Sequence, residues 1–251
     1  VNSLTDFKIP NPLIINEKYL TKYFEHFDSL FKKKKDLRVL LAISGGSDSM
    51  LLLYLFLIYF KGNNRAIKIA HINHNLRNDS FKDEAFVTKV GLELGINTYI
   101  RQLNPKLKSN DESIESWARR ERYNSLSEIL IESNSNIILT GHHKNDQVET
   151  ILKNISEKTG LFGLGGMKAI NNNLIRPLLP FTKIELMRII DKYKIPYVYD
   201  TSNDELRFKR NFIRKKVLVP WALNDKKIVD SIAESGANFS EYQQSLMYFI
   251  N

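Results

Sequence analysis

Short apolar runs alternate with longer amphipathic stretches through the first 145 residues. The run Arg38–Ile43 is branched and continuous, as is typical of a strand buried on both faces. The next segment, Asp48–Phe60, is apolar nearly all round and predicts a buried helix. The same pattern predicts strands at Ala66–Ile72, Asn97–Leu103 and Asn136–Thr140, and helices at Ser80–Leu94 and Asp111–Ser133. This alternation predicts an α/β fold with a parallel sheet and helices on both faces.

The pattern loosens after residue 145. Four glycines within Gly160–Gly166 predict a flexible loop, and Lys183–Tyr193 predicts a helix that ends before Pro196. The stretch Asp200–Arg214 is irregular and then basic, and Ile228–Ile250 predicts a further helix. We expect a domain edge near Lys215–Asp225, which separates residues 1–220 from a helical segment, linker or start of another domain at 221–251.

One capping detail is also predicted. Ser80 is expected to cap the helix Ser80–Leu94, because Asp83 follows three residues later as in a capping box.

Composition narrows the chemistry. The chain has no cysteine, which excludes disulfides, thiolate nucleophiles, cysteine-ligated zinc and iron–sulfur clusters. Its longest apolar run, Met50–Phe60, is far shorter than the roughly 20 residues of a membrane span. Val1–Asn16 lacks the features of a secretory signal, so a cytoplasmic protein is expected. The 37 Lys and Arg against 28 Asp and Glu give a net charge of +9, which favours a polyanionic partner such as nucleic acid.

A glycine turn joins the first predicted strand to the first predicted helix. Its residues are Ser44, Gly45, Gly46, Ser47, Asp48 and Ser49. Two glycines leave backbone amides uncovered, and the helix start adds its positive dipole end, so the loop suits a pyrophosphate. It lacks both the Gly-Lys-Ser/Thr ending of a Walker loop and the G-x-G-x-x-G fingerprint. Asp48 would repel phosphate unless a cation lies between them, which predicts Mg²⁺. The alternative is an ordinary Ser/Gly turn in which Asp48 is the N-cap of the following helix.

The hexapeptide resembles the SGGxDS motif of the N-type ATP pyrophosphatases, the PP-loop superfamily. This resemblance implies a Rossmann-like fold, ATP bound by residues 44–49, and cleavage of ATP between the α and β phosphates. Members of the superfamily adenylate a carbonyl oxygen, and a nucleophile then displaces AMP.

Further stretches, all in register, resemble the tRNA(Ile)-lysidine synthetase family within that superfamily. They are HINHNLR at 71–77, ESWARRERY at 115–123, HHKNDQVET at 142–150, the glycine-rich 160–167, RPLL at 176–179, DTSND at 200–204 and RNFIR at 210–214. Asn145 stands where the family usually has Asp. A tRNA thiolase would need cysteines, and 251 residues leave no room for a glutaminase domain, so an amine taken from solution is favoured.

The resemblance implies ATP-dependent ligation of free L-lysine to C2 of the wobble cytidine in the CAU anticodon of tRNA(Ile). Lysidine would form through an adenylated cytidine, with release of pyrophosphate and AMP. The implied catalytic residues are Asp48, Arg122, Asp146 and Glu149. The implied substrate contacts are His74, Arg77, Arg119, His142, Asn203, Arg210 and Arg214. A homodimer is left open.

Plainer readings exist for several of these residues. His71 and His74 could be packing histidines, Arg119 could belong to a solvated salt-bridge ladder, and Asp146 with Glu149 could be a surface pair. Lys32–Lys35 could be a solvated charged run, whereas the basic residues between 207 and 216 are expected to contact tRNA. Two other functions also stay open: an amidating ATP pyrophosphatase that acts on a small carbonyl substrate, and a non-catalytic nucleotide- or RNA-binding module.

Overall fold

The computed structural model of the protein describes residues 20–31, 36–61, 66–199 and 204–250. No helix within these ranges is long and apolar enough to cross a membrane. The described chain divides into two compact units, each built from several stretches. The first comprises Val1–Gly141, Asn172–Pro177 and Met187–Tyr199, and the second His142–Asn171, Leu178–Leu186 and Asp200–Asn251. The predictions for Val1–Asn16, Lys32–Lys35 and Asn203 lie outside the described residues.

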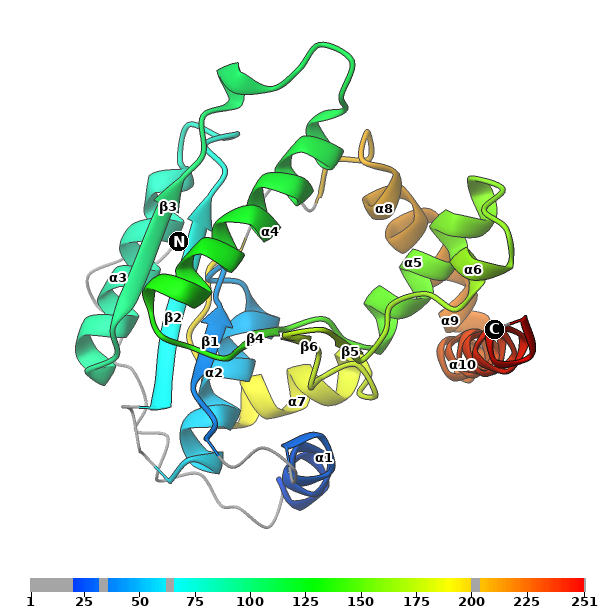
Figure 1. Ribbon diagram of the computed structural model, residues 1–251, viewed down its shortest axis with the longest axis horizontal. Coiled ribbons are helices and arrows are strands. Elements are labelled where there is room, and N and C mark those ends of the chain that lie inside the picture. The colour runs from blue at the N-terminus through cyan, green and yellow to red at the C-terminus, as the bar shows by residue number, and fades with distance from the viewer. Residues whose placement is uncertain (1–19, 32–35, 62–65, 200–203, 251) are drawn as a thin grey trace. The chain divides into compact units, whose positions relative to one another are not determined.

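The first unit carries the sheet (Figure 1). Its elements are α1 (Thr21–Phe31), β1 (Val39–Ala42), α2 (Ser47–Tyr59), β2 (Ile67–Asn73), α3 (Ser80–Leu94), β3 (Thr98–Gln102), the 3-10 turn η4 (Pro105–Leu107), α4 (Ile114–Glu132), β4 (Ile137–Thr140) and β6 (Leu174–Ile175). Helix α7 (Lys183–Tyr193) begins in the second unit and ends in the first.

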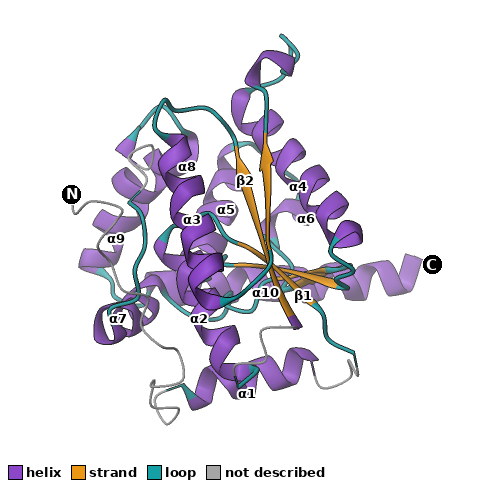
Figure 2. Cartoon of the chain, turned by 90° about the vertical axis from the view of Figure 1, so that its left-hand side faces the viewer, coloured by secondary structure: helices purple, strands orange, loops and turns teal. Residues whose placement is uncertain are grey.

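Five strands of the sheet belong to the first unit and lie in the order β3-β2-β1-β4-β6. All four neighbouring pairs are parallel, and Leu40 of β1 is in register with Lys68 of β2 and Ile138 of β4. Figure 2 shows α2 and α3 on one side of these strands and α4 on the other. The predicted α/β fold with helices on both faces is therefore confirmed.

Burial on both faces explains the continuous apolar strands. In β1, Leu40 packs in a core cluster with Ala70 and with Ile129 of α4. Helix α2 is buried from Ser49 to Ile58, as its uniformly apolar sequence predicts. An aromatic cluster holds α1 in this unit, with the ring of Phe27 stacked 4.7 Å from that of Phe56.

The second unit is mainly helical. Its elements are α5 (Lys144–Ser156), α6 (Leu161–Leu164), the two-residue strand β5 (Ile170–Asn171), α8 (Lys209–Phe212), the π-helical segment η6 (Ile213–Leu218), α9 (Val219–Asn224) and α10 (Ile228–Ile250). Val148 of α5, Leu218 of η6 and Val229 of α10 form its core cluster with Ile228. The π-helical turn explains why Ile213 and Leu218, five residues apart, are both buried, since an α-helix would turn them well away from each other.

The structure corrects two local predictions. The glycine-rich stretch Gly160–Gly166 contains the one-turn helix α6, which Asn154 holds by donating from Nδ2 to the Gly163 carbonyl. Helix α3 does begin at Ser80, but its N-cap is Asp79, which makes no side-chain capping bond. The division into residues 1–220 and 221–251 stays a prediction; helical structure runs from Lys209 to Asn224 across the expected edge.

Candidate functional site

The predicted phosphate loop joins β1 to α2 in the first unit. Gly45 has φ +91°, a conformation that strains a residue with a side chain, and an added Cβ would lie 3.4 Å from the Phe86 ring. Its carbonyl accepts a hydrogen bond from Val198 N at 2.9 Å. The turn therefore depends on glycine at this position.

Two serines hold the loop in shape. Ser49 Oγ donates to the Gly46 carbonyl at 2.9 Å and accepts from Ser44 N at 3.2 Å. Ser44 Oγ lies 3.2 Å from Ser49 Oγ and accepts from Gly46 N at 3.3 Å. These bonds are internal to the loop and add to the contact with Val198, and Ser49, which is buried, supports the turn from inside.

Asp48 is the second residue of α2, whose N-cap is Gly46, so the reading of Asp48 as the cap is wrong. The main chain at Asp48 and Ser49 touches Gly141 closely, since a Cβ on Gly141 would lie 3.0 Å from Asp48 C and O and from Ser49 N. No group of three or more His, Cys, Asp or Glu among the described residues could hold a metal ion by itself. One carboxylate at a phosphate loop nevertheless suits Mg²⁺, which is usually bound by one or two carboxylates together with substrate phosphates.

Two histidines at the carboxyl end of β2, His71 within the strand and His74 just after it, are kept neutral. His71 is buried, and its Nδ1 donates to the Ile43 carbonyl at 2.9 Å. Burial lowers the pKa of His71. Burial, and then the charges of Arg122 and His71, lowers the pKa of His74 to about 4. Both rings are therefore uncharged at pH 7.

Arg77, which was expected to contact substrate, is engaged at the start of α3. Its guanidinium forms a short ion pair with Asp83 and lies 3.5 Å from Asp79. The Asp83 carboxylate therefore meets Arg77, and Ser80 N donates to the Arg77 carbonyl at 3.2 Å, so neither bond of the predicted capping box at Ser80 is made.

Arginines surround Tyr123 of α4. The Cζ atoms of Arg122 and Arg119 lie 5.0 and 5.1 Å from the centre of its ring, and Arg122 donates to the phenol oxygen at 3.5 Å. Burial would raise the pKa of Tyr123, but Arg122, Arg119 and the buried Arg176 together lower it. A cluster of this kind favours negative charge, so it is suited to an anion.

The solvated salt bridges that were considered for Arg119 are formed instead by the next residue, Arg120. Arg120 is exposed and pairs with Glu112 at 2.9 Å and, by a short contact, with Glu121. Such exposed pairs contribute little to stability.

The start of α5, in the second unit, is fixed by a capping box. His143 Nδ1 accepts from Asp146 N at 3.3 Å, and Asp146 Oδ2 accepts from His143 N at 2.9 Å. Asn145, at the position where Asp was expected, accepts from Lys183 N through its Oδ1 at 2.9 Å, at the first residue of α7. An oxygen acceptor is all that this contact requires, so the amide can replace a carboxylate there.

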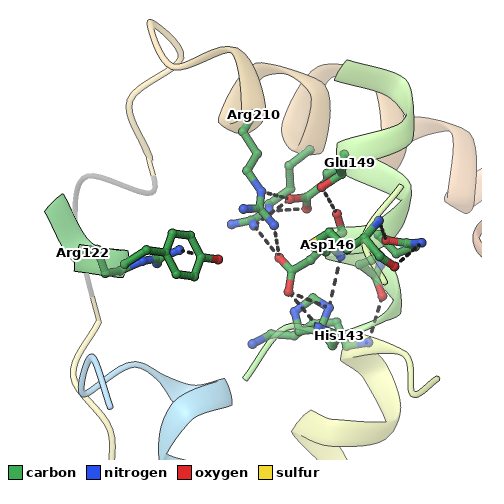
Figure 3. Close-up of polar contacts among 12 residues, drawn as sticks. Arg122, His143, Asp146, Glu149 and Arg210 are labelled. Carbon is green, nitrogen blue, oxygen red and sulfur yellow. Dashed lines mark hydrogen bonds and ion pairs between the residues drawn. The ribbon is translucent and has the colours of Figure 1, made fainter. Parts of the chain in front are cut away.

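Asp146 and Glu149 lie on one face of α5 and are buried, so the reading of a surface pair is wrong. Figure 3 shows Arg210 between the two carboxylates. Arg210 donates to Asp146 Oδ1 at 2.6 Å and to Glu149 Oε2 at 2.8 Å. Arg214 donates to both oxygens of Glu149, at 2.6 and 2.9 Å. We call these four residues the carboxylate–arginine cluster; its formal charges sum to zero.

The cluster keeps Asp146 ionised. Burial alone would raise the pKa of Asp146, but the charges of His143, Arg210 and His142 and the backbone N–H of His143 hold it well below its usual range. Burial likewise opposes the charge of Arg210, whereas Asp146 and Glu149 raise its pKa.

Gln147, which lies between the two carboxylates in sequence, holds a neighbouring stretch of main chain in place through hydrogen bonds. Its Nε2 donates to the carbonyls of Gly165 and Met167 at 3.2 Å each, and its Oε1 accepts from Met167 N at 2.7 Å. Gly166 has φ +66°, and an added Cβ would lie 2.7 Å from Gln147 Nε2. Gln147 therefore clamps the chain that follows α6.

The sequence-predicted residues thus fall into two groups, one in each unit. Asp146, Glu149, Arg210 and Arg214 come together with His142 beside them. In the first unit, His74 and Arg119 lie near Arg122. The parts played by Tyr123, Arg176, His143 and Gln147 were missed, although all four occur in the motifs quoted above.

A parallel sheet whose first strand leads through a Ser-Gly-Gly loop into a buried helix defines an α/β domain whose helix start is suited to nucleotide phosphates. Residues 19–220 match the model of the PP-loop domain, and the chain belongs to this family.

Its curated relatives include three proteins named tRNA(Ile)-lysidine synthase. The one from Chlorobaculum tepidum is 36% identical over 216 residues, which are 85% of this chain and 64% of the relative. Those from Thermosipho africanus and Pseudothermotoga lettingae are 37% and 38% identical, over 82% and 78% of this chain and 48% and 44% of the relatives. The chain therefore spans about half the length of the curated relatives it matches.

Two solved structures share the fold. A U34-tRNA thiolase from Methanococcus maripaludis, solved with its iron–sulfur cluster, superposes with a TM-score of 0.73 at 17% identity, over 90% of this chain and 81% of that one. An NH3-dependent NAD synthetase from Campylobacter jejuni gives a TM-score of 0.54 at 16% identity, over 89% and 96%. At these identities the likeness concerns the fold alone.

Proposed function

We propose that this chain catalyses the ATP-dependent ligation of L-lysine to C2 of the wobble cytidine in the CAU anticodon of tRNA(Ile), forming lysidine. The observation that carries the proposal is the name shared by the relatives that match most of the chain. Residues 1–220 are the proposed catalytic domain. A cytoplasmic location belongs to the same proposal, and a homodimer stays a prediction.

The phosphate loop is the proposed ATP site. Its glycine turn and the start of α2 offer amides and a positive dipole end to the phosphates. Asp48 would hold Mg²⁺, which when bound offsets the charge that develops on pyrophosphate. The cytosine oxygen is a poor leaving group until adenylation makes it part of AMP, so this half of the reaction comes first.

Arg122 is the proposed partner of the adenylate phosphate. The Tyr123 ring lies against its guanidinium and holds it in position. Arg119 and Arg176 add positive charge around the same phenol. A group that is fixed before the reaction stabilises developing charge without the cost of reorganisation.

The carboxylate–arginine cluster is the proposed site for the amine. Asp146 is a poor general base, because its pKa lies well below the pH at which an efficient base operates. It is better suited to hold an ammonium than to accept a proton from it. Arg210 and Arg214 also bear on the chemistry: lysine must attack as a neutral amine although its free pKa is about 10.4, and nearby like charges favour loss of its proton.

Two measurements on the same variants test the proposal: release of AMP and incorporation of labelled lysine into a tRNA(Ile) transcript. Asp48→Asn should lower AMP release roughly 100-fold, because the phosphates lose their cation bridge. Glu149→Gln should raise the lysine concentration needed for half-maximal incorporation about tenfold, since a charged hydrogen-bond acceptor is lost. ATP affinity should stay unchanged in Glu149→Gln.

Glu157→Gln is the matched control, because Glu157 is an exposed carboxylate just beyond α5. It should behave like the parent in both assays. AMP release that needs neither tRNA nor lysine would indicate an amidating enzyme for a small substrate. RNA binding with no AMP release in the parent would indicate a non-catalytic binding module.

A further inference from the structure

The helical run from Lys209 to Asn224 leaves large flat side chains in solvent. Phe212 is 48% exposed and Trp221 is 45% exposed, whereas Ile213 and Leu218 of the same run are buried. Single exposed apolar residues are ordinary, but two aromatic rings within about three turns of one helical run form a feature that a partner can use.

The spacing along this run suits a chain of bases. Phe212, Lys216 and Pro220 recur every four residues and are all exposed, so they lie along one strip of the run. Trp221 directly follows Pro220. An aromatic ring offers a face on which any base can stack, and a lysine between such rings can meet a phosphate.

Charge on the same segment favours RNA over an apolar protein partner. Residues 204–227 carry eight Lys and Arg against three Asp and Glu, a net charge of 8 − 3 = +5. Arg210, Arg214 and Lys209 are already matched by carboxylates outside this segment. Lys215 and Arg207 pair with Asp204 and Glu205 within it, so Lys216, Lys226 and Lys227 carry the surplus. Arg207 lies over the Phe208 ring, with Cζ 4.9 Å from its centre, at the start of the run.

We propose that Phe212, Lys216 and Trp221 form a platform that stacks unpaired bases of an RNA loop. The inference rests on the proposed function and deepens it by assigning the surface that receives the loop. Phe212 lies between Arg210 and Arg214 in sequence, so a base stacked on it is held within one helical turn of the carboxylate–arginine cluster. The platform therefore delivers unpaired nucleotides to the proposed amine site.

Tryptophan fluorescence tests the platform directly. The chain has two tryptophans, and Trp117 is buried, so a change in emission on adding RNA reports chiefly on Trp221. The probe is a short RNA hairpin whose loop carries CAU, compared with a fully paired duplex of equal phosphate number. The hairpin should quench the emission and the duplex should not, because only unpaired bases can stack. In Trp221→Phe the quenching should vanish while affinity stays close to that of the parent.

Variants separate stacking from charge. Phe212→Ala should weaken hairpin binding about tenfold without changing its salt dependence, and Phe212→Tyr should restore it. Lys216→Ala should instead lower the salt slope by about 0.7, the contribution of one phosphate on a single strand. Leu223→Ala, an exposed aliphatic on the same run, is the control and should bind like the parent. All four variants should keep the parent's ATP affinity.

Parent-like hairpin binding by Phe212→Ala, or quenching by the duplex equal to that by the hairpin, would overturn the platform. So would a change of oligomeric state in Phe212→Ala without loss of RNA affinity, because the strip would then be a contact between copies. Lysine incorporation by the parent separates the two proposals. A parent that incorporates lysine while Phe212→Ala binds normally contradicts the platform alone. A parent that incorporates none while the variant loses hairpin binding contradicts the proposed function alone.

Discussion

Replacement of Arg210 by Met should destabilise the second unit by about 3 kcal/mol at pH 7. Arg210 is the residue that donates to both buried carboxylates, at 2.6 Å to Asp146 and 2.8 Å to Glu149. Methionine keeps much of the aliphatic bulk but leaves two carboxylates facing each other with one guanidinium between them. The matched control is Lys216→Met, which removes an exposed cation from the same helical run.

The magnitude follows from what is lost. Two charge-assisted hydrogen bonds contribute about 1.5–3 kcal/mol each, and removal of one partner of a buried pair typically costs about 3–5 kcal/mol. The lower end applies here for two reasons. The Arg210 side chain is about a third exposed, and Arg214 still lies 3.6 Å from Asp146. Lys216→Met should cost less than about 0.5 kcal/mol, because it removes only a surface charge.

Urea unfolding is followed by the emission of Trp221 in a Trp117→Phe background, so that the signal comes from the second unit, and the parent for the comparison carries Trp117→Phe as well. The pH dependence has a definite sign. The folded pKa of Asp146 is depressed, so its contribution is present above the unfolded value of 3.8 and is lost as pH falls through that value and below. The difference between parent and Arg210→Met should therefore be largest near neutral pH and shrink as pH falls below about 4.

Equal unfolding midpoints for Arg210→Met and Lys216→Met at pH 7 would refute the carboxylate–arginine cluster as a stabilising unit. A large difference that does not change with pH would refute the part assigned to the ionised Asp146. In that case the loss would reflect packing of the arginine stem.

Two further stability predictions concern packing. Phe27→Ala should cost about 3–5 kcal/mol by urea unfolding, because it empties a fully buried site against Phe56; a change within 0.5 kcal/mol would contradict that packing. Gly166→Ala should cost about 1–3 kcal/mol, because it combines a positive φ with a Cβ 2.7 Å from Gln147, and Gly160→Ala, which has open space and a negative φ, should cost less in the same measurement.

The sequence predicted those helices and strands in which apolar, buried residues recur at regular intervals along the chain. The predicted bounds of α3, α7 and α10 agree with the structure, and the four long strands agree to within one or two residues. These segments have an apolar pattern that their own sequence determines. Helix α6 was missed because its four residues follow one glycine and contain another, and its support comes from outside: the Asn154 side chain and packing on α10. No local pattern contains such support.

The sequence predicted which residues of the candidate site share a helix face, but not which residues they form ion pairs with. The i, i+3 spacing of Asp146 and Glu149 correctly placed both carboxylates on one helix face. Their partners lie more than sixty residues away, where a basic run resembles an RNA contact, so Arg210 and Arg214 were expected to meet phosphate. The available signal was the matching i, i+4 spacing of the two arginines, which would put both on one face opposite the acids. Spacing alone could not decide between a buried carboxylate and a phosphate as the partner.

The π-helical turn at Ile213–Leu218 also sets the rotational phase of everything that follows it. Relative to an α-helix it accommodates about one extra residue per turn, so deletion of one residue there would restore α-helical winding and leave α9 close to its present rotational phase. An insertion or deletion in the α-helical residues that follow would instead rotate everything after it by about 100°. The segment Ile213–Leu218 is therefore the part of this run that best tolerates the loss of one residue. Relatives that lack the π turn should show a single-residue gap between the arginines of the cluster and the tryptophan.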